Sequence, residues 1–355
     1  MILVINAGSS SLKYKLFDRD LHVRASGNFE ELISHDEAIE KLQDMFDFSD
    51  IAVIAHRVVH GGEHFSAPVV IDEAVLQTLE SLIPLAPLHN PANIAAIRAF
   101  TPLDITQVAV FDTAFHQSMP EASYRYALPN ELYEKYAVRR YGFHGSSHEY
   151  VSKEAAKIVQ KEPINAITLH IGNGVSLCAV KEGKSIDTTM GFTPLEGVVM
   201  GTRSGSIDPG IVFYLQKEGY SPTQIEHTLN KKSGLVALAG TNDMRAILSR
   251  SDADAKRAVA IYTHALKKAL GAYLALLGKV DAIVFTGGIG ERSAKIRSLA
   301  CNGLEAFGIA VDPAENRANK TVFSTKESRI KLLCIPTDEE RQIALHAKKI
   351  VRIAP

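Results

Sequence analysis

The chain opens on a pattern of apolar and polar positions that predicts two strands joined by a tight turn. Residues 2–5 (ILVI) are all apolar, as in a buried strand, and the polar run Asn-Ala-Gly-Ser-Ser-Ser follows at 6–11. Residues 12–17 (LKYKLF) then alternate between apolar and polar side chains, which is typical of a half-exposed strand. The N-terminus therefore predicts a strand, a turn and a second strand.

The same pattern returns in the second half of the chain. Residues 167–171 (ITLHI) are followed by a Gly-Asn-Gly turn, by the apolar run 175–180 and by a Glu-Gly-Lys turn before another mixed stretch. Self-similarity of this kind indicates one supersecondary unit that occurs twice. The chain of 355 residues is also longer than one hydrophobic core usually serves, so we expect two domains, 1–147 and 148–340.

Helical signals alternate with short apolar runs elsewhere, which favours the α/β class. His89-Asn90-Pro91 places a cap residue and a first-turn proline ahead of a helix at 92–100. Ser146 and Glu149 have capping-box spacing ahead of a helix through 151–161. Further expected elements are a buried strand at 108–111, a helix from 221, a long helix over 254–278, a strand at 282–285 that runs into a glycine turn and a helix, and a helix over 338–352.

Composition and charge exclude several classes of protein. A hydrophobic content of 46% with 22% charged residues is typical of a folded globular chain. The net charge of −1 offers no overall field to hold a nucleic acid or an anionic membrane, and no apolar stretch approaches the roughly 18 residues of a membrane span. The opening residues are too short for a signal peptide, and the three cysteines lack CxxC spacing, so a reduced, cytoplasmic protein is expected.

Glycine turns after strands favour phosphate binding, because backbone amides approach an anion closely only where side chains are absent. Each turn taken singly is more often a plain hairpin. The common nucleotide signatures are missing: a P-loop ending in Gly183-Lys184-Ser185 would need glycine at Cys178, and Gly288-Ile289-Gly290 has Ser293 in place of the third glycine of a dinucleotide fingerprint.

Two arginines are candidates for binding an anion. Arg57 directly follows an apolar run, where a charge at a buried strand end needs a partner, and Arg203 lies between small residues in Gly-Thr-Arg-Ser-Gly. A guanidinium binds carboxylate and phosphate groups in a bidentate manner. A structural salt bridge is an equally good interpretation of either arginine from its local pattern.

Asp112 and His144 are candidates for chemistry beside an anion. Asp112 ends a predicted strand, where a metal-shell or base role and an N-cap role are equally good interpretations. His144 stands in a glycine-flanked turn ahead of a predicted helix, whose first amides favour an anion. A zinc site from His144 and His148 is disfavoured because no third ligand follows at suitable spacing, and the serines at 9–11 form no Gly-x-Ser-x-Gly elbow.

Ten motifs along nearly the whole chain resemble those of the acetokinase family of short-chain carboxylate kinases, in the same order. One such motif would be weak, but ten in order are specific. They are NAGSSSLK at 6–13, HRVVHGG at 56–62, PLHNP at 87–91, FDTAFH at 111–116, YGFHG at 141–145, GNG at 172–174, GTRSG at 201–205, DMR at 243–245, GGIGE at 287–291 and TDEE at 337–340.

The resemblance implies an α/β fold of the actin, sugar-kinase and Hsp70 group, in which two duplicated domains with a ribonuclease H-like βββαβαβα core close on a nucleotide cleft. It implies an N-terminal ATPase-type domain at 1–147, with a C-terminal helix at 341–355 packed back on it, and a nucleotide-binding and dimerisation domain at 148–340. The implied protein is a cytoplasmic homodimer that uses Mg²⁺ or Mn²⁺ and reversibly transfers the γ-phosphoryl group of ATP to acetate, giving ADP and acetyl phosphate.

The resemblance also implies roles for single residues. Arg57 and Arg203 would bind the carboxylate or the phosphoryl group in flight, His144 would stabilise the transition state, and Asp112 would position the acid and its arginine. Asn6 and Glu339 would hold the metal. An apolar pocket for the acyl methyl would be lined by Val59, Leu88, Phe143 and Pro194, and the nucleotide would contact Ser9, Ser11, Lys13, His170, Ile171, Gly172, Asn173, Gly174, Asp243, Met244, Arg245, Gly287, Gly288, Ile289, Gly290 and Glu291.

The chain departs from the family pattern at three places, which concern nucleotide preference more than catalysis. It is short between the first hairpin and Ile51, the approach to Asp243 is Gly-Thr-Asn, and Arg292 follows Glu291 where asparagine is common. Propionate kinase shares nearly all the motifs and is the alternative function. A regulator on the same fold that binds nucleotide without catalysis is the alternative from another class, and the joint presence of Arg57, Arg203 and His144 counts against it.

Overall fold

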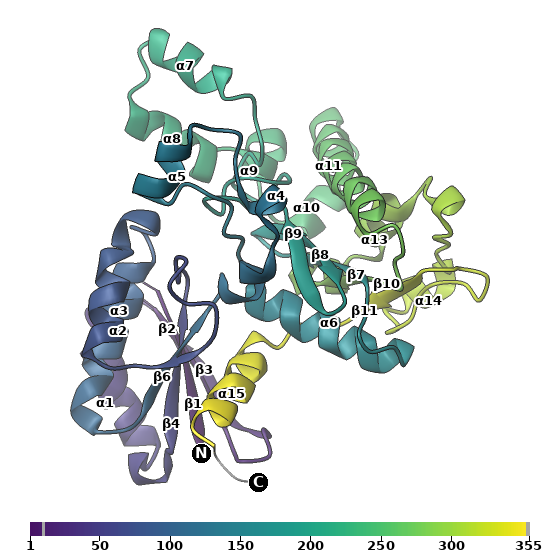
Figure 1. Ribbon diagram of the computed structural model, residues 1–355. Helices are drawn as coiled ribbons and strands as arrows, with labels where there is room; N and C mark the ends of the chain where they lie inside the picture. Colours follow the sequence, from purple (N-terminus) through teal and green to yellow (C-terminus); the bar gives the residue numbers. More distant parts are fainter. Residues whose placement is uncertain (9–10, 353–355) are drawn as a thin grey trace. The chain divides into compact units, whose positions relative to one another are not determined.

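The computed structural model describes residues 1–8 and 11–352, and its internal contacts divide the chain into two compact units (Figure 1). Unit 1 comprises Met1–Gln117, Phe143–Glu149 and Asp338–Pro355. Unit 2 comprises Ser118–Gly142 and Tyr150–Thr337. Residues 118–142 thus belong to unit 2 although they precede the expected boundary at 147, and the assignment of an ATPase-type domain and a dimerisation domain stays a prediction.

Unit 1 is built on a six-stranded sheet in the order β3-β2-β1-β4-β6-β5. β1 pairs with β2 antiparallel and with β4 parallel, and β4 pairs with β6 parallel. The strands are β1 (Ile2–Ala7), β2 (Leu12–Phe17), β3 (Val23–Phe29), β4 (Val53–Val58), β5 (Val69–Val70) and β6 (Gln107–Phe111).

Both faces of this sheet are covered, which is why its central strands are apolar without alternation. Leu3 and Ile5 pack in a cluster that contains Leu42 of α1 (His35–Met45). Ile2 and Val4 point to the other face and pack with Ile343 of α15. In Figure 1, α15 (Glu339–Ile350) lies on one face of the sheet. The other face is covered by α1, α2 (Glu73–Ser81) and α3 (Asn90–Phe100).

Unit 2 is built on a five-stranded sheet in the order β11-β10-β7-β8-β9. β7 pairs with β8 antiparallel and with β10 parallel, and β10 pairs with β11 parallel, so this sheet repeats the order β6-β4-β1-β2-β3 of unit 1. The duplicated unit expected from the sequence is confirmed. The strands are β7 (Ala166–Ile171), β8 (Val175–Lys181), β9 (Lys184–Thr188), β10 (Ala282–Thr286) and β11 (Lys331–Cys334).

Helices account for much of the rest of unit 2. The long α11 packs against β8 and α9, and it buries Tyr262, Leu266 and Leu270 on the side toward them. Its bounds and those of the other helices are α4 (Glu121–Tyr124), α5 (Asn130–Tyr136), α7 (Gly210–Lys217), α8 (Pro222–Lys231), α9 (Gly234–Ala239), α10 (Met244–Leu248), α11 (Ala253–Leu277), α12 (Gly287–Arg292), α13 (Ala294–Cys301) and α14 (Pro313–Arg317).

The helix that begins in unit 1 and continues in unit 2, α6 (Gly145–Val159), differs from the expectation. The capping-box spacing of Ser146 and Glu149 predicts a later start, but the helix already begins at Gly145, because the N–H of Gly145 donates to the backbone carbonyl of Asp112 at 2.9 Å. The helix expected from residue 221 is present as α8 (Pro222–Lys231), and Ser221 and Gln224 form a capping box at its start. In the described part of the chain, no helix is long and apolar enough to span a lipid bilayer.

Candidate active site

The central charged pair of unit 1 joins the ends of two parallel strands. Arg57 lies near the end of β4, and Asp112 directly follows β6, which is the neighbouring parallel strand. Nε of Arg57 donates to Oδ1 of Asp112 at 3.0 Å, and Nη2 donates to Oδ2 at 2.5 Å. Burial lowers the pKa of Arg57, but the carboxylates of Asp112, Glu339 and Glu340, with Asp112 the foremost, together hold the pKa above its ordinary value. Asp112 therefore keeps the guanidinium charged and fixes its plane.

Asn6 and Glu339 face the same guanidinium. Nη1 of Arg57 donates to Oδ1 of Asn6 at 3.1 Å, and Oε2 of Glu339 lies 4.0 Å from Nε. Arg57 keeps further N–H groups without a partner among the residues that the structure describes. A half-buried arginine that still has N–H groups to donate is suited to bind an anion.

The predicted metal ligands suit magnesium or manganese in donor chemistry. Asn6 offers an amide oxygen and Glu339 a carboxylate, and hard divalent cations take oxygen ligands. Burial raises the pKa of Glu339, and the charge of Arg57 offsets part of this rise. A bound cation would stabilise the charged form of this partly compensated carboxylate, so Asn6 and Glu339 fit the expected ion.

Two lysines of the first hairpin are bound to the N-terminal turn of α15. Lys13 forms an ion pair with Glu340, and Lys15 lies 2.8 Å from Asp338 and 3.3 Å from Glu340. Lys13 therefore already has an anionic partner within unit 1. Ser11 accepts a backbone hydrogen bond from Gly8 at 2.8 Å, whereas the predicted contact Ser9 lies outside the described residues.

Two buried asparagines of α3 hold the loop that follows Arg57, a role that their sequence context did not indicate. Oδ1 of Asn93 accepts from the N–H of Val59 at 3.1 Å, and Oδ1 of Asn90 accepts from the N–H of His60 at 3.2 Å. The amide of Asn93 also donates to the carbonyl of Ala7 at 3.0 Å. In sequence, Asn90 looks like a helix cap and Asn93 like a polar position inside a helix, and their burial separates them from both kinds of position.

His144 stands in a turn with a left-handed backbone. Its φ is 59°, which is unusual for a residue with a side chain. An added Cβ on Gly145 would meet the carbonyl oxygen of Asp112 at 2.1 Å, so this position requires glycine. The turn therefore lies directly against the residue that binds Arg57.

The expected apolar pocket is only partly assembled within unit 1. Val59 and Phe143 are buried, whereas Leu88 is 66% exposed. Pro194 belongs to unit 2, where its carbonyl accepts a hydrogen bond from Nη1 of Arg203 at 3.1 Å. Leu88 is thus an accessible apolar side chain in unit 1.

Arg203 is half-buried in unit 2 and has no carboxylate partner among the described residues. Its guanidinium contacts only the Pro194 carbonyl and, at 3.8 Å, the sulfur of Met200. Burial lowers the pKa of Arg203. Of the two structural salt bridges that the sequence left open, the one of Arg57 is formed, with Asp112, and none is formed by Arg203 within the part of the chain that the structure describes.

The loop of Arg203 is fixed to the glycine turn between β7 and β8. Gly201 donates its N–H to the carbonyl of Asn173 at 2.9 Å, and an added Cβ on Gly201 would meet Oδ1 of Asn173 at 2.0 Å. The N–H of Leu235, at the start of α9, donates to the carbonyl of Met200 at 3.0 Å. The arginine is thereby held on a rigid loop.

A cavity of about 540 Å³ in unit 2 brings together three of the stretches predicted to bind nucleotide. This volume lies within the range of about 300–1,000 Å³ that is usual for small-molecule sites. Two parts of the wall follow the adjacent parallel strands β7 and β10 at their carboxyl ends, where ligands bind in open α/β sheets. The lining residues are Gly172, Asn173, Asn242, Asp243, Met244, Arg245, Leu248, Gly288, Ile289, Arg292 and Ser293.

Other predicted nucleotide contacts support this wall from behind. Oε1 of Glu291 accepts from the N–H groups of Gly287 at 2.9 Å and Thr337 at 3.1 Å. An added Cβ on Gly287 would lie 2.9 Å from the backbone of Ile171, so the two strand ends are in close contact. The remaining predicted contacts, which do not line the cavity, are His170, Gly174 and Gly290.

Asp243 and Arg245 form an exposed pair at the start of α10. Asp243 accepts a hydrogen bond from the backbone N–H of Arg245 at 2.9 Å and lies 3.0 Å from its Nη2. Arg292, on the same cavity wall, forms no hydrogen bond or ion pair with any residue that the structure describes. It is therefore the cation of this cavity that has no protein partner in the described chain.

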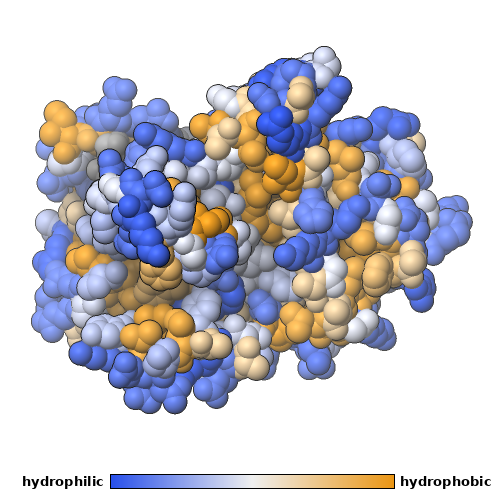
Figure 2. Space-filling view, turned by 90° about the horizontal axis from the view of Figure 1, so that it is seen from above, coloured by the Kyte–Doolittle hydropathy of each residue, from blue (hydrophilic) through white to orange (hydrophobic). Residues whose placement is uncertain are grey.

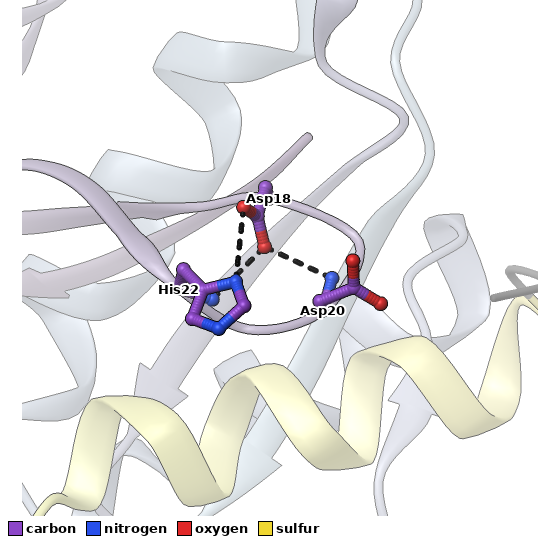
Figure 3. A group of neighbouring side chains, drawn as sticks. All are labelled: Asp18, Asp20 and His22. Carbon is purple, nitrogen blue, oxygen red and sulfur yellow. Dashed lines mark hydrogen bonds and ion pairs between the residues drawn. The ribbon is translucent and has the colours of Figure 1, made fainter.

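Asp18, Asp20 and His22 form a compact group of metal-type ligands outside this site (Figure 3). Oδ1 of Asp18 accepts from the backbone N–H groups of Asp20 and His22, both at 2.9 Å. The group is thus explained as the hydrogen bonding of a tight turn between β2 and β3.

The fold and the site define a class of protein. Two copies of one sheet topology, with charged groups at the carboxyl ends of the central strands, form the α/β fold of the actin, sugar-kinase and Hsp70 group that we expected. The model of the acetokinase family matches residues 36–345. The chain belongs to this family, and its activity is that of a kinase that transfers phosphate to a carboxylate.

Individual relatives agree over nearly the full length. Acetate kinase from Streptomyces coelicolor is 45% identical over 393 aligned positions, covering 99% of this chain and 97% of the relative, and acetate kinase from Thermotoga maritima is 46% identical over 396, covering 99% and 98%. The crystal structure of Porphyromonas gingivalis acetate kinase matches with a TM-score of 0.94, 40% identity and 99% coverage of both chains. A propionate kinase from Francisella tularensis matches with a TM-score of 0.93 and 42% identity, covering 97% of this chain and 98% of the other.

Proposed function

We propose that the chain catalyses the reversible transfer of the γ-phosphoryl group of ATP to acetate, giving acetyl phosphate and ADP, by direct in-line transfer. The observation that carries the residue-level mechanism is the guanidinium of Arg203, half-buried without a carboxylate partner among the described residues. Keeping a charge partly dehydrated is unfavourable unless an anion binds there during function.

The chemistry needs alignment and charge neutralisation more than proton transfer. An ionised carboxylate is already a nucleophile, so its attack requires no general base. The transition state of phosphoryl transfer is loose and spreads charge over the equatorial oxygens, which cations and hydrogen-bond donors stabilise. Arg57, Arg203 and His144 supply such groups, and Asp112 holds Arg57 charged and oriented.

The nucleotide is proposed to occupy the cavity between the glycine turns and α10 in unit 2. The backbone of Gly172 and Gly288 would approach the phosphates, because neither carries a side chain. Asn6 and Glu339 would hold Mg²⁺, which neutralises phosphate charge when it is bound. Val59 and Phe143 would contact the acyl methyl.

Propionate is the alternative acceptor, favoured by the similarity to the Francisella tularensis propionate kinase. One methylene changes binding in an apolar pocket by only about 1–3 kcal/mol. Acetate is the preferred substrate in this proposal because the similar acetate kinases from Streptomyces coelicolor and Thermotoga maritima match nearly the whole chain at 45% and 46% identity.

The experiment is a hydroxylamine trap of the acyl phosphate with ATP and Mg²⁺, run in parallel on acetate, propionate and butyrate. We expect acyl hydroxamate with kcat/KM in the order acetate, propionate, butyrate. Omission of ATP and omission of Mg²⁺ serve as controls. Absence of hydroxamate from every acid would overturn the kinase reaction and leave the non-catalytic regulator, while a faster reaction with propionate would reverse the substrate order.

A cytoplasmic homodimer is proposed with this activity. Unit 2 carries exposed large apolar side chains on α7, namely Ile211, Phe213 and Tyr214. Figure 2 shows a face of the molecule on which hydrophobic groups are interspersed among hydrophilic residues. Sedimentation velocity at micromolar concentration tests the assembly, and a single monomeric species would contradict it.

A further inference from the structure

His144 adopts a backbone conformation that its surroundings must enforce. A left-handed conformation is unfavourable for a residue with a side chain, because its Cβ comes too close to the following carbonyl oxygen. The φ of 59° at His144 therefore depends on contacts to the neighbouring peptide groups. Such strain at a residue proposed to touch the reacting atoms raises the question of what holds it.

Both peptide groups that flank His144 are held by the segment after β6. On the C-terminal side, the N–H of Gly145 donates to the carbonyl of Asp112 at 2.9 Å. On the N-terminal side, the carbonyl of Phe143 lies 3.0 Å from Nε2 of His116. His116 belongs to the short 3-10 helix Ala114–Ser118, four residues after Asp112, so one segment clamps the turn at both ends.

The imidazole of His116 is fixed as a neutral hydrogen-bond donor. Its side chain is completely buried, and burial lowers its pKa to about 4. The partner of Nε2 is a carbonyl oxygen, which only accepts, so Nε2 carries the proton. The ring also meets the ring of His148 edge-on at 5.6 Å, and the N–H of His148 donates to the carbonyl of His144 at 3.0 Å.

We propose that His116 is a positioning residue that holds His144 in its left-handed conformation by donating a hydrogen bond to the carbonyl of Phe143. The inference rests on the proposed function, in which His144 stabilises the transition state. His116 contacts neither substrate nor nucleotide in this proposal. Its loss lets the Phe143 peptide rotate and moves His144 away from the charge that develops during transfer.

The test compares His116→Met with His116→Gln. The two replacements are similar in length, but only glutamine keeps an N–H donor near the position of Nε2. We expect H116M to lower kcat about 10- to 100-fold with KM for ATP and acetate within twofold, because a small misplacement in an active site has an effect of this size. We expect H116Q to recover most of the lost kcat.

A matched control is available at His56 in the same unit. His56 is also fully buried, its pKa is lowered by burial to about 4, and its Nε2 lies 2.7 Å from Oε1 of Gln107, away from the His144 turn. H56M and H56Q report the general effect of replacing a buried histidine. Equal losses of kcat in H56M and H116M would assign His116 a purely structural role and overturn the proposal.

The decisive measurement is a double-mutant cycle with His144→Ala. If His116 acts through His144, H116M has no further effect on kcat once His144 is removed. Multiplicative losses in the double variant would overturn the proposal. Should H116M fail to fold by circular dichroism, His116→Leu, which also lacks the N–H donor, closes the same cycle as H116L against H116L/H144A. Failure of the proposed function is separately visible as absence of hydroxamate from the wild-type enzyme.

Discussion

Asp112 contacts Arg57 with its side chain and the turn that contains His144 with its backbone. Its carboxylate accepts two hydrogen bonds from Arg57, at 3.0 and 2.5 Å, and its backbone carbonyl accepts one at 2.9 Å from Gly145, the residue after His144. A single position after β6 therefore sets the plane of the guanidinium and the place of the histidine. The carboxylate binds Arg57 and the backbone carbonyl binds the turn, so a side-chain replacement tests the first contact while it keeps the second.

Replacement of Asp112 by asparagine removes the charge and one acceptor while it keeps the backbone contact. We expect Asp112→Asn to lower kcat/KM for acetate about 100-fold, because one charge-assisted hydrogen bond to Arg57, of about 1.5–3 kcal/mol, is lost and the other is weakened by the loss of charge. Steady-state kinetics measures this loss. The matched control is Glu80→Gln, which makes the same change in the exposed pair of Glu80 with Arg98 and is expected to change kcat/KM less than twofold. Similar values for both variants would remove the Asp112 carboxylate from the mechanism.

Replacement of Arg203 by alanine is expected to abolish most turnover and keep the fold. An arginine that neutralises charge in phosphoryl transfer contributes about 10³–10⁵ in rate, or roughly 4–7 kcal/mol of barrier. Arg203→Ala leaves no buried carboxylate unpaired, so the melting temperature should stay near that of the wild type. Single-turnover phosphoryl transfer and thermal unfolding measure the two properties, with Arg203→Lys as the variant that keeps charge without the planar fork. Turnover near the wild-type rate in the alanine variant would exclude Arg203 from the reaction.

Arg292 is expected to act on nucleotide binding and not on the acceptor. It lines the 540 Å³ cavity and has no partner among the described residues, so its N–H groups are available to an anionic or acceptor-rich ligand. We expect Arg292→Gln to raise KM for ATP about tenfold, as the loss of one charge-assisted hydrogen bond would do, with KM for acetate unchanged. The control Arg317→Gln replaces an exposed arginine of α14 outside the cavity lining. A tenfold rise in KM for acetate instead would place Arg292 on the acceptor side.

Buried histidines make the stability of unit 1 depend on pH. Burial lowers the pKa of His56, His60 and His116 to about 4, below the value near 6.5 that an unfolded chain has. Between pH 6.5 and 4 the unfolded state therefore binds more protons, so stability is complete above pH 6.5 and falls as the pH falls toward 4.

The size of this effect is about 1.4 kcal/mol per pH unit for each such histidine. We expect His56→Gln to reduce the slope of unfolding free energy against pH by about this amount between pH 6 and 5. Urea unfolding followed by circular dichroism measures the slope, with His22→Gln as the control because His22 is exposed. An unchanged slope in H56Q would contradict the assignment of a neutral buried imidazole at His56.

The duplicated fold was predictable from the sequence because both sheets place an apolar central strand before a glycine-containing turn and a second strand. Leu3 and Val4 point to opposite faces of the sheet, and both are buried. Because both faces are covered, residues 2–5 are all apolar and do not alternate with polar residues. Pairing of β7 with β10 depends on contacts across more than a hundred residues and could be inferred only from the repeat.

The internal geometry of the site was less predictable. Arg57 and Asp112 were both recognised as candidates, but their ion pair depends on the parallel register of β4 with β6, which no local pattern reports. The start of α6 at Gly145 was missed because the backbone of Asp112 sets it. The contacts of Asn90 and Asn93 with the loop after Arg57 were missed, because Asn90 looks like a helix cap and Asn93 like an ordinary polar helix position in sequence.

Asn173 links the wall of the cavity in unit 2 to the loop that carries Arg203. Its backbone carbonyl fixes the loop of Arg203 through Gly201, while the residue itself lines the cavity of unit 2. A change in the course of this turn shifts the wall against which a nucleotide would rest and the arginine that would meet the transferred group. A substitution at Asn173 that altered nucleotide preference would therefore also alter the rate of phosphoryl transfer. Exposed wall positions such as Arg292 hold no loop in place, so substitutions there can change nucleotide preference with less effect on that rate.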